Sequence, residues 1–271
     1  MPIIALLTDF GTRDHYVASM KGVILRIVPH VTLVDITHEV APQDVLSAAF
    51  ELAACCREFP PGTIFVVVVD PGVGTPRRAL GGSAGDYVFV GPDNGVLAPV
   101  LDRPGARVVE LTNPEYARAE VSRTFEGRDR FAPAAAWLAH GVPLGDLGPA
   151  VARIAPVPWP APHVREAAVA GEVLKVDRFG NLISNIDRRL LEQCACAPPV
   201  VRIAGCNVLR FAQTYGETAA GELCALVGSS GYLEVAVNGG SAAERLHAGR
   251  GTALYVGKDF AALDAVAGRI D

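Results

Sequence analysis

Residues 63–74 read TIFVVVVDPGVG, an apolar run that ends in an acidic, glycine-rich stretch. The run carries no charge and is dominated by β-branched residues, which is typical of a strand buried on both faces. Such strands are found in parallel sheets, where helices cover both faces. Residues 3–8 form a second uncharged apolar run. The two stretches together predict an α/β sheet.

The segments around these two strands alternate between strand and helix patterns. Apolar residues recur at helical spacing over residues 16–28, and a helix over 43–59 follows Pro42 and ends at Pro60. Further segments complete the pattern: strands over 31–36, 87–90 and 107–111, and a helix over 131–140. Alternating βα units predict a mainly parallel sheet flanked by helices.

The pattern changes after a proline-rich stretch at residues 155–162, which we expect to be an extended linker. Short strands with turn signals follow, over 171–176, 182–186, 200–203, 223–227, 233–237 and 252–256. They favour a small antiparallel β-domain, either a sandwich or a barrel. We therefore predict two domains, an N-terminal α/β domain over residues 1–158 and a C-terminal β-domain over 165–271.

Charge and hydropathy exclude several classes of partner. The 271 residues carry 24 basic and 29 acidic side chains, a formal net charge of −5, without a basic run of five or more. Nucleic acids and anionic membranes are therefore poor partners. No apolar run reaches the roughly 18–20 residues that span a bilayer. The first residues lack a basic leader and a cleavage site, so we expect a cytoplasmic protein.

The six cysteines do not predict a disulfide framework in a chain of this size without a secretory signal. Cys55 and Cys56 lie in a helical stretch and are expected to fill the core. Cys194 and Cys196 have the spacing of a metal-ligand pair, but no matching Cys or His pair lies nearby in the sequence. Buried free thiols are the interpretation that we favour.

Acidic side chains follow three of the predicted strands. Asp9 follows the first strand, Asp70 follows the run at 63–69, and Asp93 follows the strand at 87–90. Ligands of parallel α/β sheets bind beyond the carboxyl ends of the strands, so these carboxylates are candidates for binding ribose hydroxyls, a metal or a proton. Structural roles remain open, because Asp9 could cap a helix and residues 93–95 could form only a turn.

The glycines and arginines after Asp70 also allow two interpretations. Gly72 and Gly74 lack the Gly-Lys-Ser/Thr sequence and the third glycine of phosphate loops, so close approach of the backbone to a ligand is the better interpretation. Arg77 or Arg78 could return to Asp70 and hold it ionised. The alternative is a solvated basic pair.

Several motifs in one order now carry a more specific resemblance. They are residues 8–11 (TDFG), 34–38 (VDITH), 69–74 (VDPGVG), 91–95 (GPDNG), 125–129 (FEGRD), 131–133 (FAP), 177–182 (DRFGNL), Asn185 and 228–238 (GSSGYLEVAVN). Single motifs of this kind are weak, but the ordered set spans residues 3 to about 245. The set resembles the S-adenosyl-L-methionine hydroxide adenosyltransferase family, relatives of the nucleoside fluorinase and chlorinase.

The resemblance implies an N-terminal α/β domain, a C-terminal β-barrel and a homotrimer whose sites lie between subunits. It implies that Asp9 holds both ribose hydroxyls. The other substrate-binding residues that it implies are Asn94, Asp177, Phe179, Asn181, Ser229, Ser230 and Asn238. S-adenosyl-L-methionine (SAM) would be the substrate, with neither a metal nor another cofactor.

The catalytic residues implied by the resemblance depart from the family at one position. In hydrolytic members an Asp, an Arg and a His surround the attacking water, and Asp70 and Arg77 match the first two. The family pattern is Phe-His-Gly-Arg-Asp, whereas this chain has Glu126 in place of the histidine. Since the halogenating relatives lack the aspartate, Asp70 disfavours a halide nucleophile.

The function implied is hydrolysis of SAM to adenosine and methionine, with Asp70, Arg77 and Glu126 at the water. Two neighbouring carboxylates disfavour joint ionisation, so one of them is a candidate to stay protonated. Two rival hypotheses remain. The missing histidine suggests a protein that binds SAM or adenosine with little or no turnover, and Asp9, Asp70 and Asp93 could hold a metal in a metal-dependent hydrolase.

Overall fold

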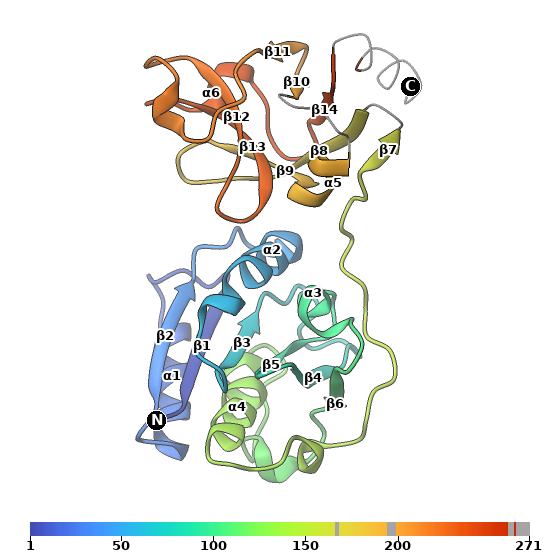
Figure 1. Ribbon diagram of the computed structural model, residues 1–271. Coiled ribbons are helices and arrows are strands. Elements are labelled where there is room, and N and C mark those ends of the chain that lie inside the picture. The colour runs from blue at the N-terminus through green and yellow to red at the C-terminus, as the bar shows by residue number, and fades with distance from the viewer. Residues whose placement is uncertain (166–167, 194–198, 260–262, 264–271) are drawn as a thin grey trace. The chain divides into compact units, whose positions relative to one another are not determined.

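A computed structural model describes residues 1–165, 168–193, 199–259 and 263. The chain divides into two compact units, Met1–Pro158 and Trp159–Asp271 (Figure 1). Cys194 and Cys196 lie outside the described residues. Within the described residues, no helix is long and apolar enough to cross a membrane.

The first unit is built on a six-stranded sheet in the order β2-β1-β3-β5-β4-β6. The strands are β1 (Ile3–Thr8), β2 (Thr32–Thr37), β3 (Ile64–Val68), β4 (Ala79–Ala84), β5 (Tyr87–Pro92) and β6 (Arg107–Glu110). β2, β1, β3 and β5 pair in parallel, and only β4 runs against its neighbours. The predicted α/β class with a mainly parallel sheet is confirmed.

Helices cover both faces of this sheet (Figure 1). α1 (Tyr16–Ile27) and α4 (Ala132–Ala139) share one apolar core with the sheet, and α2 (Val45–Cys55) and α3 (Ala98–Leu101) share the other. Short 3-10 or π-helical turns complete the unit: η1 (Cys56–Glu58), η2 (Pro114–Tyr116), η3 (Gly127–Phe131) and η4 (Leu144–Leu147).

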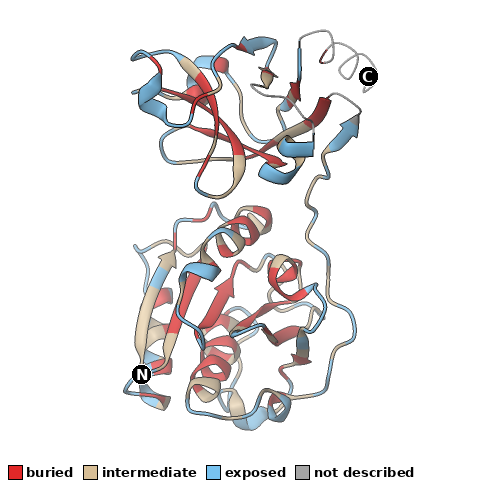
Figure 2. Ribbon diagram, in the orientation of Figure 1, coloured by how far each residue is buried: buried red, intermediate tan, exposed pale blue. Residues whose placement is uncertain are grey.

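The central strand shows why a continuous apolar run forms here. Ile64, Val66 and Val68 lie in the core under α1 and α4, while Phe65 and Val67 lie in the core under α2 and α3. Successive side chains of a strand point to opposite faces, so a strand buried on both sides needs apolar residues throughout. Burial of each large side chain stabilises the fold by about 1.5–3 kcal/mol. Figure 2 shows the resulting buried centre of the unit.

The antiparallel strand β4 has no counterpart among the predicted strands. Its sequence is ALGGSA, which lacks both an apolar run and an alternating pattern. Its two glycines are tightly packed: a Cβ atom on Gly82 would lie 2.7 Å from Cδ1 of Leu101, so the leucine side chain would have to shift. A tight turn at Gly85, with φ of +58°, then returns the chain into β5.

The helix expected over residues 43–59 is shorter in the structure, where α2 covers only Val45–Cys55. Gln43 has a positive φ of 67° and cannot be the first turn of a helix. Asp44 is the N-cap of α2 instead, and its side chain accepts a hydrogen bond from the Ser47 amide at 3.1 Å. Cys55 ends α2, and burial, with a smaller effect of Cys56, raises the pKa of its thiol to about 11.

The second unit is a nearly closed antiparallel barrel in the order β11-β10-β14-β8-β9-β13-β12, with β7 paired to β8. Its strands are β7 (His163–Arg165), β8 (Ala168–Val176), β9 (Leu182–Asp187), β10 (Val200–Ile203), β11 (Cys206–Val208), β12 (Leu223–Val227), β13 (Tyr232–Val237) and β14 (Ala253–Gly257). The helical segments are α5 (Arg188–Gln193), α6 (Ala242–Leu246) and η5 (Tyr215–Glu217). β11 and β12 are the two end strands of this order. The segment that follows β11 contacts β12, where the Ala212 amide donates a hydrogen bond to the Ala225 carbonyl at 2.8 Å.

Candidate active site

The carboxyl ends of β1 and β3 bring two of the predicted carboxylates to one edge of the sheet. The strands pair in parallel, with Thr8 opposite Val68, so Asp9 and Asp70 follow neighbouring strand ends. A cavity of about 400 Å³ opens between them. Its lining residues are Asp9, Phe10, Tyr16, Pro42, Gln43, Val68, Asp70, Pro71, Val73, Thr124, Phe125, Glu126 and Gly127.

Asp9 belongs to this cavity and does not cap the helix that follows it. The N-cap of α1 is His15, which makes no capping side-chain hydrogen bond. Asp9 Oδ2 instead accepts a hydrogen bond from the Gln43 amide at 2.7 Å. The left-handed conformation of Gln43 is uncommon for a residue other than glycine, and it is found where that amide meets Asp9.

Asp70 is bound by Arg77 through two parallel hydrogen bonds. Arg77 Nε donates to Asp70 Oδ1 at 2.9 Å, and Arg77 Nη2 donates to Asp70 Oδ2. Both side chains are largely buried. The loop between them turns at Gly74, where φ is +77° and a Cβ atom would lie 2.6 Å from the carbonyl oxygen of Arg123. The paired fork geometry fixes the orientation of the carboxylate as well as its charge.

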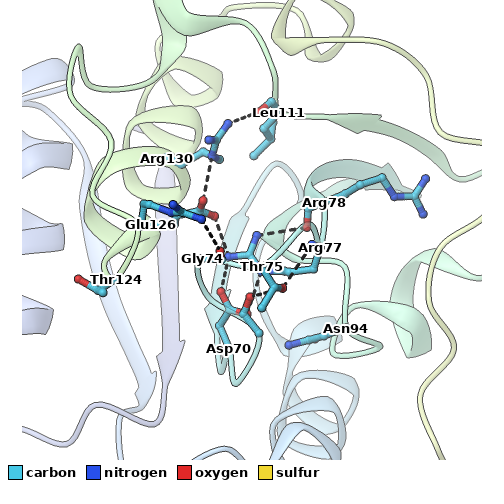
Figure 3. Close-up of polar contacts among 12 residues, drawn as sticks. Asp70, Gly74, Thr75, Arg77, Arg78, Asn94, Leu111, Thr124, Glu126 and Arg130 are labelled. Carbon is cyan, nitrogen blue, oxygen red and sulfur yellow. Dashed lines mark hydrogen bonds and ion pairs between the residues drawn. The ribbon is translucent and has the colours of Figure 1, made fainter.

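Arg77, and not Arg78, is the arginine that contacts Asp70 (Figure 3). Arg78 Nε donates to Asp93 Oδ2 at 2.8 Å, and Arg78 Nη2 donates to the Arg153 carbonyl at 2.7 Å. The two neighbours immediately precede β4, and successive side chains in extended chain point to opposite sides. The alternative interpretation of Arg77 and Arg78 as a solvated basic pair is therefore wrong, because each arginine binds an aspartate.

Glu126 completes the buried charged cluster. Arg77 Nη2 donates to Glu126 Oε2 at 2.7 Å, so one guanidinium binds two carboxylates (Figure 3). The Glu126 side chain is 15% exposed and lines the cavity. It directly precedes the π-helical turn η3, a distortion that occurs often at functional sites. The structure therefore brings Asp9, Asp70 and Glu126 to the same cavity.

Opposing effects act on the shared guanidinium. Burial lowers the pKa of Arg77, but the hydrogen bonds and charges of Asp70 and Glu126 outweigh this effect and raise the pKa above its ordinary value. The guanidinium carbon also lies 5.3 Å from the centre of the Phe131 ring, within the range of cation–π attraction. Arg77 is therefore a permanent cation between two acidic groups.

Asp93 and Asn94 have their polar atoms turned toward the protein backbone and Arg78. Asn94 Nδ2 donates to the Val69 carbonyl at 2.9 Å, and its Oδ1 accepts from the Val96 amide at 3.1 Å. Asp93 Oδ1 accepts from the Ala155 amide at 2.7 Å. Asp93 is thus not gathered with Asp9 and Asp70 as a metal site would require, and the described residues contain no metal-binding group of three or more His, Cys, Asp or Glu.

The remaining predicted site residues lie in turns of the second unit. Asp177 Oδ1 accepts from the amides of Phe179 and Asn181, both at 2.9 Å, and Asp177 Oδ2 accepts from Asn181 Nδ2 at 2.9 Å. This closed turn presents the Phe179 ring, which is 75% exposed. An exposed aromatic ring on a rigid turn is available to stack on a planar ligand.

A second turn, between β12 and β13, carries Ser229 and Ser230. Ser229 is exposed, whereas the hydroxyl oxygen of Ser230 is buried and has no hydrogen-bond partner among the described residues. Asn238, just after β13, donates from Nδ2 to the Thr218 carbonyl at 2.7 Å. The second unit therefore offers one unsatisfied hydroxyl and one exposed ring among the predicted residues.

Sequence reasoning did not single out the aromatic wall of the cavity. The Phe125 ring lies 6.0 Å from Phe10 and 5.1 Å from Tyr16, centre to centre. Tyr16 begins α1, and the sequence identifies it only as one residue of the helical pattern over residues 16–28. The motifs that contain Phe10 and Phe125 could have indicated these positions, because both rings adjoin an acidic residue of the site. The wall gives the cavity an apolar surface that suits a planar ring.

The fold and this cavity define an α/β protein with a small-molecule site at its strand ends, followed by a β-barrel unit. The model of the SAM hydroxide adenosyltransferase N-terminal domain matches residues 4–148, and that of the C-terminal domain matches residues 171–255. The chain belongs to the SAM hydroxide adenosyltransferase family, as its ordered motifs suggested.

Similar proteins carry two kinds of name. The chain is 44% identical to an (R)-S-adenosyl-L-methionine hydrolase of Salinispora tropica, over 94% of this chain and 97% of that protein. It is 32% identical to a fluorinase of an Actinoplanes species, over 88% and 91%. A crystal structure of an uncharacterized conserved protein from Thermotoga maritima superposes with a TM-score of 0.88, at 39% identity, covering 93% of this chain and 99% of that one.

Proposed function

We propose that this chain is an enzyme that hydrolyses SAM to adenosine and methionine by attack of water on the 5′ carbon of the ribose. The observation that carries the proposal is the buried Asp70–Arg77–Glu126 cluster, whose two carboxylates both line one cavity. The relatives named as SAM hydrolases support it, including one from Thermus thermophilus at 42% identity.

The reaction needs a positioned water more than it needs a covalent intermediate. A water oxygen forms a bond to the 5′ carbon while the bond from that carbon to sulfur breaks. The electron pair of the broken bond stays on sulfur, and the cationic sulfonium becomes the neutral thioether of methionine. The water loses one proton. Holding water in line with the breaking bond and shielding it accounts for most of the catalysis that such a step requires.

Asp70 is the group that we assign to this water. Its carboxylate lines the cavity and is held in one orientation by two hydrogen bonds from Arg77. It accepts a hydrogen bond from the water, and the proton as the new bond forms. Glu126 shares Arg77 and lines the same wall, so it serves as the second acceptor. A carboxylate here also disfavours a halide nucleophile, because two anions repel.

Asp9 is assigned to the ribose, because one carboxylate can accept hydrogen bonds from two vicinal hydroxyls. Hydrogen bonds to a charged group contribute about 1.5–3 kcal/mol each, so loss of both in Asp9→Ala should weaken adenosine binding by about 10²–10⁴-fold. Calorimetry with adenosine measures this loss. Unchanged affinity would contradict the assignment.

The residues of the second unit are assigned to the remaining parts of the substrate. Asp177, Asn181, Ser229 and Ser230 are proposed to bind the methionine end, and Phe179 and Asn238 to contact the adenine or the amino acid. Asn94 is better assigned to its turn, since both ends of its amide bind the backbone.

We also propose a homotrimer with its sites between subunits. The support is the family membership together with candidate ligand residues in both units. Light scattering should give three times the chain mass of 28.4 kDa. A monomer at micromolar concentration would contradict this assembly.

The decisive experiment is incubation of the purified protein with SAM, followed by chromatography of the products. Adenosine and methionine should accumulate in equal amounts. The matched control is Asp70→Asn, which keeps the shape of the side chain and removes its charge. Lack of adenosine from the wild-type protein over hours would contradict the proposed function, and bound but unconverted SAM would indicate a binding protein.

A further inference from the structure

The exchange of histidine for Glu126 changes the charge of the site. Asp70 and Glu126 both accept hydrogen bonds from Arg77, and in both bonds the donor is Nη2. With both carboxyl groups ionised, the three side chains would carry two negative charges and one positive charge. An excess negative charge in a largely buried cluster is unfavourable unless a further cation balances it.

Arg130 lies where such a cation is needed. It is four residues after Glu126, and its Nε lies 3.8 Å from Glu126 Oε1 (Figure 3). Arg130 Nη1 donates to the Leu111 carbonyl at 2.8 Å, which anchors the guanidinium. Its Nε is buried and makes no hydrogen bond within the described part of the chain, so the neighbouring carboxylate is its nearest electrostatic partner there.

Arg130 acts from behind the cavity. Arg130 does not line the cavity. It lines a separate small pocket together with Leu111, Tyr116 and Leu147. The turn η3 determines this direction: the Ala132 amide bonds to the Gly127 carbonyl, one residue further back than in an α-helix. Glu126 therefore faces the cavity on one side and Arg130 on the other.

We propose that Arg130 is a positioning residue that acts through Glu126, balancing its charge so that Asp70 and Glu126 are both ionised at neutral pH. It compensates in this chain for the carboxylate that stands at the family's histidine position. The inference rests on the proposed function. A neutral imidazole at position 126 would need no such counter-charge.

The proposal predicts a specific change in the pH dependence of turnover. The charged or titratable groups around Glu126 are Arg77, Asp70, Arg130 and, on the same cavity, Asp9 and Tyr16. Arg130→Met keeps the apolar stem and removes the charge. We expect it to move the acidic limb of the kcat profile upward by about one pH unit, a tenfold effect on the ionised fraction below that limb. KM should change little, since Arg130 does not reach the cavity.

Two variants control for structure and for net charge. Arg130→Lys keeps the positive charge and should retain most of the wild-type profile. Arg103→Met removes an exposed arginine of the same unit and should leave the profile unchanged. In a Glu126→His background, Arg130→Met should have less than about a twofold effect on kcat, because the charge that it balances is gone. An equal effect in both backgrounds would overturn the proposal.

A second measurement does not depend on turnover and so separates this inference from the proposed function. A double-mutant cycle compares the unfolding midpoints of Glu126→Gln, Arg130→Met and the double variant at pH 7. Arg130→Met should lower the midpoint less when Glu126 is already Gln, because the paired charge is absent. Additive shifts would show that the two side chains are not coupled and would overturn the inference, even if SAM is hydrolysed.

Discussion

Arg77 and Arg78 are neighbours in the sequence, and each binds an aspartate that follows a parallel strand, yet the two pairs differ in almost every other respect. The Arg77 side chain is 10% exposed and serves two carboxylates at a cavity. The Arg78 side chain is 37% exposed and joins Asp93 to the carbonyl of Arg153. The carboxylates bound by Arg77 line the cavity, whereas Arg78 links the loop at Asp93 to the chain segment at Arg153.

This difference shows that an ion pair indicates a reactive site only through its surroundings. Asp93 accepts from Arg78 and from the Ala155 amide, which occupies both of its oxygens within the protein. Asp70 is also bound on both oxygens, but it lines a cavity of about 400 Å³. Acid–base work requires a lone pair that a ligand or water can still reach.

The largest effect that separates the two pairs should come from the aspartates. Asp70→Asn should reduce turnover by about 10²–10⁴-fold, the usual contribution of a positioned acid–base group. Asp93→Asn, the matched change in the other pair, should leave turnover close to that of the wild type. Initial rates of adenosine release at saturating SAM measure both. Similar losses in the two variants would remove the functional distinction between the pairs.

A smaller and opposite effect is expected at Glu126. Glu126→His places an imidazole beside Asp70 and Arg77, where its ring nitrogen can act as a proton acceptor near neutral pH. We expect turnover to rise by up to about tenfold at pH 7, within the range of a single acid–base contribution. Glu126→Gln, which removes the charge but keeps the shape, is the control and should be slower than the wild type. An unchanged rate in both variants would show that Glu126 takes no part in the reaction.

The smallest effect on turnover should come from Arg78. Arg78→Met leaves the buried Asp93 without its cation, but the arginine itself is more than a third exposed, so the loss is screened and amounts to about 1 kcal/mol. That loss corresponds to a decrease of about 2–4 °C in the melting temperature of a unit of this size. Differential scanning calorimetry measures the decrease, and adenosine release should be close to the wild-type rate. A collapse of turnover would mean that the second pair also shapes the site.

The sequence predicted the parts of this molecule in which one physical pattern dominates. The run at residues 63–69 predicted β3, because a doubly buried strand leaves no polar position. The ends of β1 and β3 predicted where Asp9 and Asp70 would lie, since parallel strands end at the same edge. The ordered motifs indicated the family that the domain models match.

The remainder depended on packing that no local pattern encodes. β4 is a strand because it pairs antiparallel with both β5 and β6, although its sequence shows neither an apolar run nor an alternating pattern. The choice between Arg77 and Arg78 depends on which side of the extended chain each occupies. The sequence does not predict the contact between Arg130 and Glu126, because it depends on the geometry of the turn η3. Assignment of these residues needed three-dimensional distances.

The left-handed backbone of Gln43 has a consequence for how the cavity receives a ligand. That conformation costs of the order of 1 kcal/mol for a residue with a side chain, and folding has already supplied this energy before any ligand arrives. The amide of Gln43 holds Asp9 in place, so the ribose that we propose for this site would meet a carboxylate whose orientational entropy is already lost. Preorganisation of this kind lowers the entropic cost of association, and less of the intrinsic binding energy is consumed in ordering the protein.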